Sequence, residues 1–372
     1  MNIFAFGASI LTSYWNGAAT YYRGNYKYLA RRGHAITFAS PDAFGRREHP
    51  DQGDFSFVDA VYYDPTSAGV DNMLRLALAA DVIVKHSGVG VDDVLLERRV
   101  LELQPAKVVV FWDVDAPATL GRMISDPDDP FRQEIPWYDA ILSYGGGPKA
   151  RSGYLAAGAR AYSSIYNGLD PETHFPVEPD PSLACDVAFL GNRLPDREAR
   201  VEALFLRAAE LAPDKQFLLG GEGWGDKRMP ANVRYIGHVA TEDHNRFNCS
   251  AGMVMNINRA SMADFGFSPP TRVFEVSGAG SCMLCDDWPG LNDCFEPGKE
   301  ILVIRSAEDV VDALRRYDNA ARRRIGEAFR ERGLRDHTYA QRALQAEQAI
   351  IECMDRRPHT LSVADAAAAE CV

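Results

Sequence analysis

Short apolar runs alternate with longer amphipathic stretches along this chain, and this alternation predicts strands separated by helices. Apolar runs such as VVVFW favour strands buried on both faces of a parallel sheet. In the first half, the predicted strands are Asn2–Phe6, Ala35–Ala39, Ser56–Tyr63, Asp81–Lys85, Lys107–Trp112 and Ala140–Ser143. The predicted helices cover residues 18–32, 69–80, 91–103 and 148–157. This half therefore predicts one doubly wound α/β domain, residues 1–170.

The alternation stops at a proline-rich segment, PETHFPVEPDPSLA, which predicts an interdomain linker over residues 171–184. It then restarts with the predicted strands Asp186–Gly191, Gln216–Gly220, Val233–Ile236, Met253–Ile257, Ser281–Cys285 and Ile301–Ile304. Predicted helices cover residues 197–211, 242–249, 271–279, 307–316 and 319–332. We expect a second α/β domain over residues 185–337, a long last helix over 338–357 and a frayed, alanine-rich tail over 358–372.

The length of 372 residues agrees with this prediction of two domains. The formal net charge of −12 makes the chain a poor general binder of nucleic acids or anionic membranes. No apolar run reaches the roughly 18 residues that a membrane span needs, and the start lacks the features of a signal peptide. Seven scattered cysteines suit reduced thiols, so we expect a cytoplasmic protein that binds no nucleic acid and has no transmembrane segment.

The most informative stretch runs from Met253 to Glu300, where a strand, a loop and a helix follow one another. Two prolines precede Thr271, and proline is tolerated just before and within a first helical turn. The free N–H groups of a helix beginning there suit a phosphate. Arg272 and Glu275 lie in its first turns, where a carboxylate can accept hydrogen bonds from sugar hydroxyls. A surface ion pair is the alternative for these two residues.

The runs NINR, SPPTRVFE, GAGSCMLCDDWPGL and FEPGKE resemble the C-terminal domain of CgeB-like glycosyltransferases. FGASILTSYWNGAATYYRGNYKYLARRGH and VVVFWDVDAPATL resemble the acceptor-side domain of the same group. This resemblance implies a GT-B fold, in which two Rossmann-like domains face a cleft and the last helix crosses back to the first domain. The second domain would hold the nucleotide-sugar. One departure is Phe267, which stands where many retaining GT-B enzymes carry a second glutamate.

Turns after the predicted strands of the second half supply further candidates for the nucleotide site. Glycines let backbone N–H groups approach a phosphate, and an arginine can neutralise it. Each of these turns can instead be a plain surface turn, and His238 can be a structural residue. The nucleotide-side candidates are Gly191, Asn192, Arg193, Gly221, Trp224, Gly237, His238, Asn258, Ser268, Thr271, Arg272 and Glu275.

In the first domain, the loop after the first strand and two later strand ends would face the cleft. The acceptor-side candidates are Gly7, Ser9, Trp15, Asn16 and Gly17. Asp113 and Asp115 follow VVVFW two residues apart, and crowding of two carboxylates raises one pKa, which helps that group accept a proton. Either can instead cap the next helix. His86 is a third candidate for the base, or a structural histidine.

These observations predict a glycosyltransferase that moves a sugar from a nucleoside diphosphate to an acceptor hydroxyl or amine. The base of the donor (UDP-, GDP- or dTDP-sugar) and the acceptor (polysaccharide, glycolipid, protein or small molecule) stay open. We expect no cofactor and no metal, because Asp113-Val-Asp115 has metal-clamp spacing but lies in the presumed acceptor domain. The alternatives are a GT-B nucleotide-sugar epimerase and a non-catalytic sugar-nucleotide-binding or surface-assembly protein. A dinucleotide dehydrogenase is disfavoured, since no G-x-G-x-x-G follows the first strand.

Overall fold

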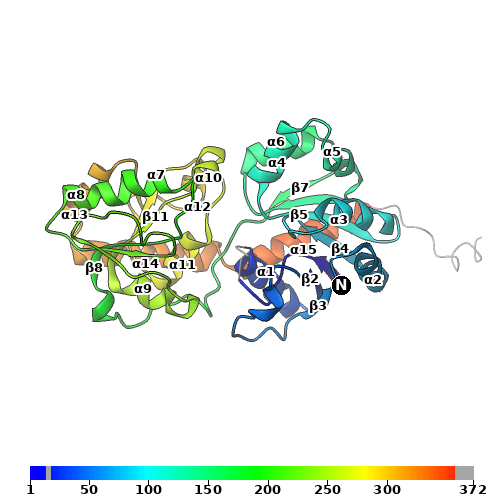
Figure 1. Ribbon diagram of the computed structural model, residues 1–372, viewed down its shortest axis with the longest axis horizontal. Coiled ribbons are helices and arrows are strands. Elements are labelled where there is room, and N and C mark those ends of the chain that lie inside the picture. Colours follow the sequence, from blue (N-terminus) through cyan, green and yellow to red (C-terminus); the bar gives the residue numbers. More distant parts are fainter. Residues whose placement is uncertain (14–17, 357–372) are drawn as a thin grey trace, which may run out of the picture.

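The computed structural model describes residues 1–13 and 18–356, which form two parallel β-sheets flanked by helices (Figure 1). The first sheet has the strand order β3-β2-β1-β4-β5-β6-β7, and the second has the order β10-β9-β8-β11-β12-β13. In each sheet the order reverses beside its first strand, which is the point where ligands bind in open α/β sheets. The predicted fold class, two doubly wound Rossmann-like domains, is confirmed.

The first sheet comprises β1 (Asn2–Phe6), β2 (Ala35–Pro41), β3 (Asp59–Tyr63), β4 (Val82–His86), β5 (Val108–Asp113), β6 (Ala140–Ser143) and β7 (Tyr162–Ser164). Its helices are α1 (Ala19–Arg31), α2 (Ser67–Ala77), α3 (Asp93–Arg99), α4 (Ala116–Ser125), α5 (Pro130–Glu134) and α6 (Gly147–Ala156). All registered strand pairs are parallel. The apolar runs of β4 and β5 are buried along their whole length, as their sequence predicts.

The second sheet comprises β8 (Cys185–Leu190), β9 (Phe217–Gly220), β10 (Val233–Tyr235), β11 (Ala251–Asn256), β12 (Met283–Asp286) and β13 (Leu302–Ile304). The predicted helix 197–211 is observed as α7 (Glu198–Val201), a π-helical turn (Glu202–Leu206) and α8 (Arg207–Leu211). The other helices are α9 (His244–Ser250), α10 (Ala260–Phe265), α11 (Thr271–Ala279), α12 (Leu291–Cys294), α13 (Ala307–Arg316), α14 (Asn319–Asp336) and α15 (Tyr339–Arg356). Short 3₁₀ turns occur at Arg46–Glu48, Val100–Leu103, Ile135–Trp137, Pro181–Leu183 and Thr241–Asp243.

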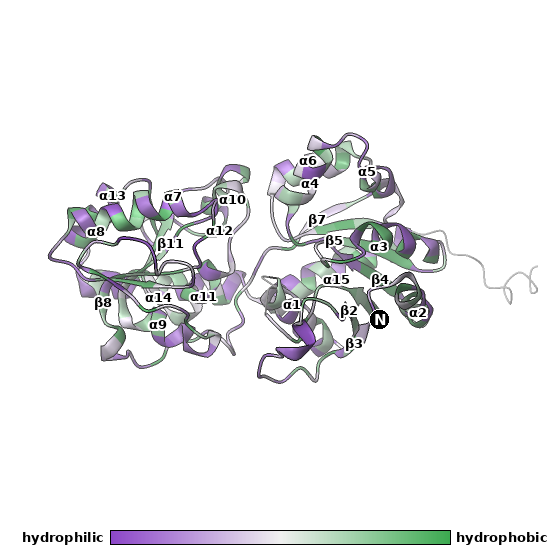
Figure 2. Cartoon of the chain, in the orientation of Figure 1, coloured by the Kyte–Doolittle hydropathy of each residue, from purple (hydrophilic) through white to green (hydrophobic). Residues whose placement is uncertain are grey.

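Apolar side chains fill both faces of each sheet, and the outward faces of the helices are polar (Figure 2). α15 belongs to the core of the first domain, although it ends the described chain. Its residues Tyr339, Ala343 and Ile350 pack in the same cluster as Val84 and Trp112 of the first sheet. Figure 1 shows α15, in orange, against the first domain. The last helix therefore crosses back, as the GT-B resemblance implies.

The chain passes between the domains twice, and the two passages pair with each other. Leu169 N donates to His337 O at 2.7 Å, and Tyr339 N donates to Leu169 O at 2.9 Å. The segment 171–184 contacts both domains: Glu172 pairs with Lys27 and Arg31 of α1, while Asp180 N donates to Ser250 Oγ and Asn245 Nδ2 donates to Thr173 O, both at 2.8 Å.

A second contact between the domains lies at the loops before α6 and α11. Gly146 N donates to Phe267 O at 2.8 Å, and Lys149 Nζ donates to Asp264 O at 2.9 Å. Phe267 has a positive φ of 48°, an uncommon conformation for a bulky residue. Asn167 Nδ2 donates to Pro269 O at 3.1 Å. These bonds fix the approach of the second domain's loop 264–269 to the first domain.

Several elements differ from the sequence-based predictions, among them α4 and α12, which the predicted helices do not include. The acidic, proline-rich loop 126–136 contains the helix α5, whose Phe131 is fully buried. The short strand β7 and the six-residue helix α10 were not predicted. Within the described residues, no helix combines the length and the apolarity that a bilayer crossing requires.

Candidate active site in the cleft between the domains

Three arginines from separate segments of the second domain gather where β8 and β11 end. Arg197 follows the loop after β8, Arg259 follows β11, and Arg272 lies in the first turn of α11. Burial lowers the pKa of Arg197, and the nearby Arg259 and Arg272 lower it further, while Asp196 and Asp286 raise it. Like charges held this close destabilise one another unless an anion joins them. The arrangement is therefore that of an anion site at the switch point of the second sheet.

Arg197 is the least compensated member of this arginine cluster. Its Nη1 makes a long hydrogen bond of 3.4 Å to Asn192 O, and its Nε has no partner among the described residues. The other two arginines have carboxylates at hand. Arg259 Nε donates to Asp196 Oδ2 at 2.8 Å, and Arg272 Nη1 lies 3.2 Å from Glu275 Oε2.

Buried polar groups at the ends of β11 and β12 form the floor beside the arginines. Asp286 is 1% exposed and accepts hydrogen bonds from Asn256 Nδ2, Asn258 N and Arg200 Nη2 at 2.7–2.9 Å. Burial raises the pKa of Asp286 despite these donors. Asn258 is also 1% exposed, and its Nδ2 has no partner among the described residues. An unpaired buried donor at this place is available to a ligand oxygen.

Glu275 lies one turn inside α11 and is only 8% exposed. Its Oε2 lies 3.5 Å from His244 Nδ1 and 3.2 Å from Arg272 Nη1. Burial alone would raise the pKa of Glu275, but Arg272, His244 and His174 together hold it well below its usual range. The helix N-terminus, Arg272 and Glu275 are thus together, as predicted. The ribose role of Glu275 stays a prediction.

Glu275→Gln should destabilise the fold by about 3 kcal/mol, because it leaves Arg272 without its buried partner. The folded-state pKa lies below the unfolded value of about 4.3, so this stabilisation is complete above that pH and is lost as pH falls through the folded pKa. Urea unfolding should therefore show a difference at pH 7 that shrinks below about pH 4. In the control Glu296→Gln, which removes the exposed pair with Lys299, the loss should stay below about 1 kcal/mol. Equal losses in both variants would contradict a buried pair.

The glycine turns of the second domain hold one another through their backbones. Gly191 N donates to Gly220 O at 3.0 Å, and Gly221 N donates to Gly237 O at 2.7 Å. Gly221 has φ 115°, and a Cβ there would lie 2.3 Å from Gly191 O, so only glycine fits. Asn192 Oδ1 accepts from Glu222 N at 2.9 Å and is used in this loop packing.

Three side chains predicted for the nucleotide site are placed elsewhere. Arg193 pairs with Glu198 and Asp226 at 2.7 and 2.8 Å. Trp224 is fully buried and donates from Nε1 to Gly191 O at 2.8 Å, so it cannot stack on a base. His238 has 69% of its side chain exposed and lies 3.8 Å from Glu222. These contacts engage Arg193 and Trp224 within the second domain, and their predicted roles in ligand binding stay predictions.

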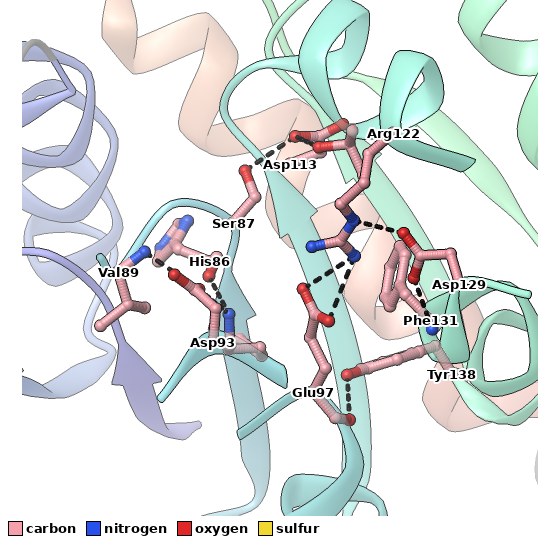
Figure 3. A network of polar contacts seen from close by, with 12 residues as sticks. His86, Ser87, Val89, Asp93, Glu97, Asp113, Arg122, Asp129, Phe131 and Tyr138 are labelled. Atoms are coloured by element: carbon pink, nitrogen blue, oxygen red, sulfur yellow. Dashed lines mark hydrogen bonds and ion pairs between the residues drawn. The ribbon is translucent and has the colours of Figure 1, made fainter. Parts of the chain in front are cut away.

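Asp113 is a structural anchor, not a free base. It is fully buried, and its carboxylate accepts four hydrogen bonds, from Ser87 Oγ, Thr119 Oγ1, Tyr154 OH and Asp115 N, at 2.5–2.9 Å. Figure 3 shows the bond from Ser87 across to Asp113. Three of these donors meet Oδ1 and Tyr154 meets Oδ2, so Asp113 fixes the end of β5 to α4 and α6.

His86 is also structural. It is 1% exposed, its Nε2 lies 2.7 Å from Tyr26 OH, and its Nδ1 lies 3.2 Å from Trp112 O. Burial lowers the pKa of His86 to about 3, which keeps the ring neutral inside an aromatic cluster. The structure therefore does not support His86 or Asp113 as the base.

Asp115 remains the first-domain carboxylate that faces the second domain. It caps α4 through a 3.4 Å bond from Ala118 N. Burial raises the pKa of Asp115, the Asp113 charge raises it further, and Arg259 across the cleft lowers it. Tyr144 is another neighbour, since the Asp115 charge adds to the burial that raises the Tyr144 pKa. Asp115 thus lies near Arg259 and Asp196 of the second domain.

The loop after β1 is packed into the first domain. A Cβ on Gly7 would lie 2.2 Å from the Phe38 ring, so glycine is required there. Ser9 is fully buried. Trp15, Asn16 and Gly17 lie outside the described residues. On the other side, Ser268 is 1% exposed and donates to Gly266 O at 3.0 Å, while Thr271 begins α11.

Sequence reasoning missed Arg197, Asp196 and Tyr144 and did not give Arg259 a role. A signal for the first was available. Arg197 occurs four residues after Arg193, at the beginning of a helix. The beginning of a helix that follows a strand and a loop is a common place for a phosphate to bind.

Comparisons with known proteins agree with this geometry. Residues 197–348 match the family described as glycosyl transferase-like. This segment includes all three arginines and Glu275. No curated protein sequence matches the chain.

Solved structures match it over nearly its whole length. Sucrose-phosphate synthase from Thermosynechococcus elongatus has 14% identity and a TM-score of 0.66, covering 96% of this chain and 100% of that one. Anabaena HepE in complex with UDP and glucose has 12% identity and a TM-score of 0.62, covering 95% and 100%. An alpha-glucosyltransferase in complex with UDP-glucose and DNA has 14% identity and a TM-score of 0.65, covering 95% and 99%. The chain therefore has the GT-B fold of these glycosyltransferases, and its residues 197–348 carry a glycosyl transferase-like sequence.

Proposed function

We propose that this protein transfers a sugar from a nucleoside-diphosphate sugar to an acceptor hydroxyl or amine in the cleft between its domains. The observation that carries the proposal is Arg197, a half-buried arginine near two other arginines, whose buried Nε has no partner and which has no carboxylate in ion-pair distance among the described residues. A diphosphate supplies the negative charge that this site lacks. The glycosyl transferase-like match over residues 197–348 supports the same reading.

In this proposal, the arginine cluster and the N-terminus of α11 bind the diphosphate. Their positive charge stabilises the leaving nucleoside diphosphate as the bond to the sugar breaks. Glu275 and the free Nδ2 of Asn258 lie beside the arginines and are proposed to contact donor hydroxyls. In this proposal, residues of the second domain alone bind the negatively charged diphosphate of the donor.

Asp115 is proposed to accept the proton of the acceptor. It is half-buried at the cleft, and its raised pKa makes its carboxylate a stronger base than an exposed aspartate. In the described residues, no group of three or more histidine, cysteine, aspartate and glutamate side chains is arranged to hold a metal. Metal-independent transfer, the CgeB-like assignment and a cytoplasmic location stay predictions.

UDP and UDP-glucose are the first ligands to test, since two of the similar structures contain them. A thermal-shift series with UDP, GDP, dTDP, CDP and ADP should give one base that stabilises the protein by about 2.7 kcal/mol at 100 times its dissociation constant. Incubation with the matching donor sugars, with and without acceptors, then separates transfer from epimerisation, which needs no acceptor. Absence of stabilisation by all five diphosphates would refute a nucleotide-sugar site.

A further inference from the structure

A cavity of about 1240 Å³ opens at the opposite edge of the first sheet from the proposed active site. Asp81, Val108 and Asp139, which line it, lie just before or at the beginnings of β4, β5 and β6. The arginine cluster and Asp115, by contrast, lie at the carboxyl ends of strands. The cavity is therefore not part of the cleft between the domains.

Glu134, the last residue of α5, lines this cavity and is only 9% exposed. Its Oε2 has no hydrogen-bond partner among the described residues. A buried carboxylate oxygen without a partner is costly, since it has lost its hydrogen bonds to water without gaining others in the protein. Glu134 Oε2 therefore lacks a hydrogen-bond donor or a positively charged group as its partner.

The surrounding charges do not supply that partner. Arg122 is already held between Glu97, at 3.2 Å, and Asp129, at 2.6 Å (Figure 3). Burial and the Glu97 charge raise the pKa of Glu134 to about 7, while Arg98 and Arg122 lower it and Asp129 raises it. Glu134 is thus poised to ionise when a cation reaches it.

The remaining walls define the rest of the ligand. Leu101, Pro105 and Met354 give the cavity an apolar surface. Trp137, which is 59% exposed, also lines the cavity. A large exposed aromatic beside a pocket offers contact area to an apolar group. The charged side chains that line the cavity besides Glu134 are of both signs: Asp81, Arg98, Glu102, Lys107, Asp139 and Arg160.

We propose that this cavity is a second ligand site, which binds a small molecule with one primary ammonium group on an apolar body. The ammonium donates to the Glu134 carboxylate, and the apolar body packs against Leu101, Pro105 and Trp137. The site is separate from sugar transfer and does not rest on the proposed function.

Calorimetric titration with 4-phenylbutylamine and with 4-phenylbutan-1-ol tests the proposal, since the two probes differ only in the charged group. At pH 8 the amine should bind at least about tenfold more tightly than the alcohol, because it gains a charged hydrogen bond. Its affinity should fall on the order of tenfold as pH drops from 8 to 5.5 and Glu134 takes up a proton.

Glu134→Gln should remove the preference for the amine and leave alcohol binding unchanged, whereas the exposed control Glu327→Gln should change neither. Trp137→Ala should weaken both probes. Added UDP should not displace the amine, and Glu134→Gln should not alter UDP binding, so this proposal and the proposed function can fail separately. Equal binding of amine and alcohol, or no effect of pH in the unmodified protein, would overturn the site even if Glu134→Gln did not fold.

Discussion

Replacing Asp115 by Asn should lower the rate of sugar transfer about 10²–10⁴-fold and leave nucleoside diphosphate affinity unchanged. Asn keeps the shape and the cap of α4 but cannot accept a proton. Binding is spared because the arginine cluster that meets the diphosphate belongs to the other domain. Steady-state kinetics beside calorimetric titration of the diphosphate would measure both quantities.

Asp128→Asn is the matched control, since Asp128 is an exposed aspartate of the same domain, and it should keep full activity. The rate of the unmodified enzyme should also fall as pH drops through the raised pKa of Asp115, because only its ionised form is a base. If Asp115→Asn keeps the full rate, the proton leaves by another route, such as an oxygen of the donor phosphate.

Asp113→Asn separates the two neighbouring aspartates. It places an amide where Ser87, Thr119, Tyr154 and a backbone N–H all donate, so its effect should be on stability. The sequence alone could not assign these roles. Both carboxylates follow the same strand, and only the packing of α4 and α6 shows which one is enclosed.

The fold was largely predictable because parallel strands buried on both faces give unbroken apolar runs, as in β5. β7 was missed because its three residues, YSS, are short and mostly polar. α5 was missed because the segment around it, residues 126–136, has three prolines and four acidic residues, a composition typical of a loop. Asp129, which accepts a hydrogen bond from Phe131 N, and Pro130 in the first turn nevertheless form a readable helix start.

The candidate site was predictable only where its residues share one regular element. Arg272 and Glu275 are three residues apart on α11, so the helix brings them together independently of the loop conformations. Arg193 and Arg197 lie in a loop and at a helix start, where spacing does not fix direction. Arg193 pairs with Glu198, five residues on, and with Asp226, 33 residues on. The pairing with the distant Asp226 has no signature in a single sequence.

Arg197→Gln should weaken nucleoside diphosphate binding about 10–100-fold, the loss expected for one or two charged hydrogen bonds. The same change should not reduce the free energy of unfolding, since Arg197 has no ion pair to lose and lies beside two like charges. Removing its charge relieves that repulsion, so stability should stay equal or rise. Loss of binding with retained stability is typical of a group kept for a ligand.

Arg193→Gln is the control, because it removes an equal charge four residues away that faces Glu198 and Asp226 instead of the cleft. It should change diphosphate affinity less than about twofold, as partly exposed pairs contribute little. Binding of the bare nucleoside should be nearly the same in both variants, since neither arginine is proposed to touch the base or the ribose. Titration of the diphosphate and the nucleoside into each variant, with urea unfolding alongside, measures all of these quantities. If Arg193→Gln weakens the diphosphate and Arg197→Gln does not, the phosphates bind on the outer side of the loop and the arginine cluster is not the donor site.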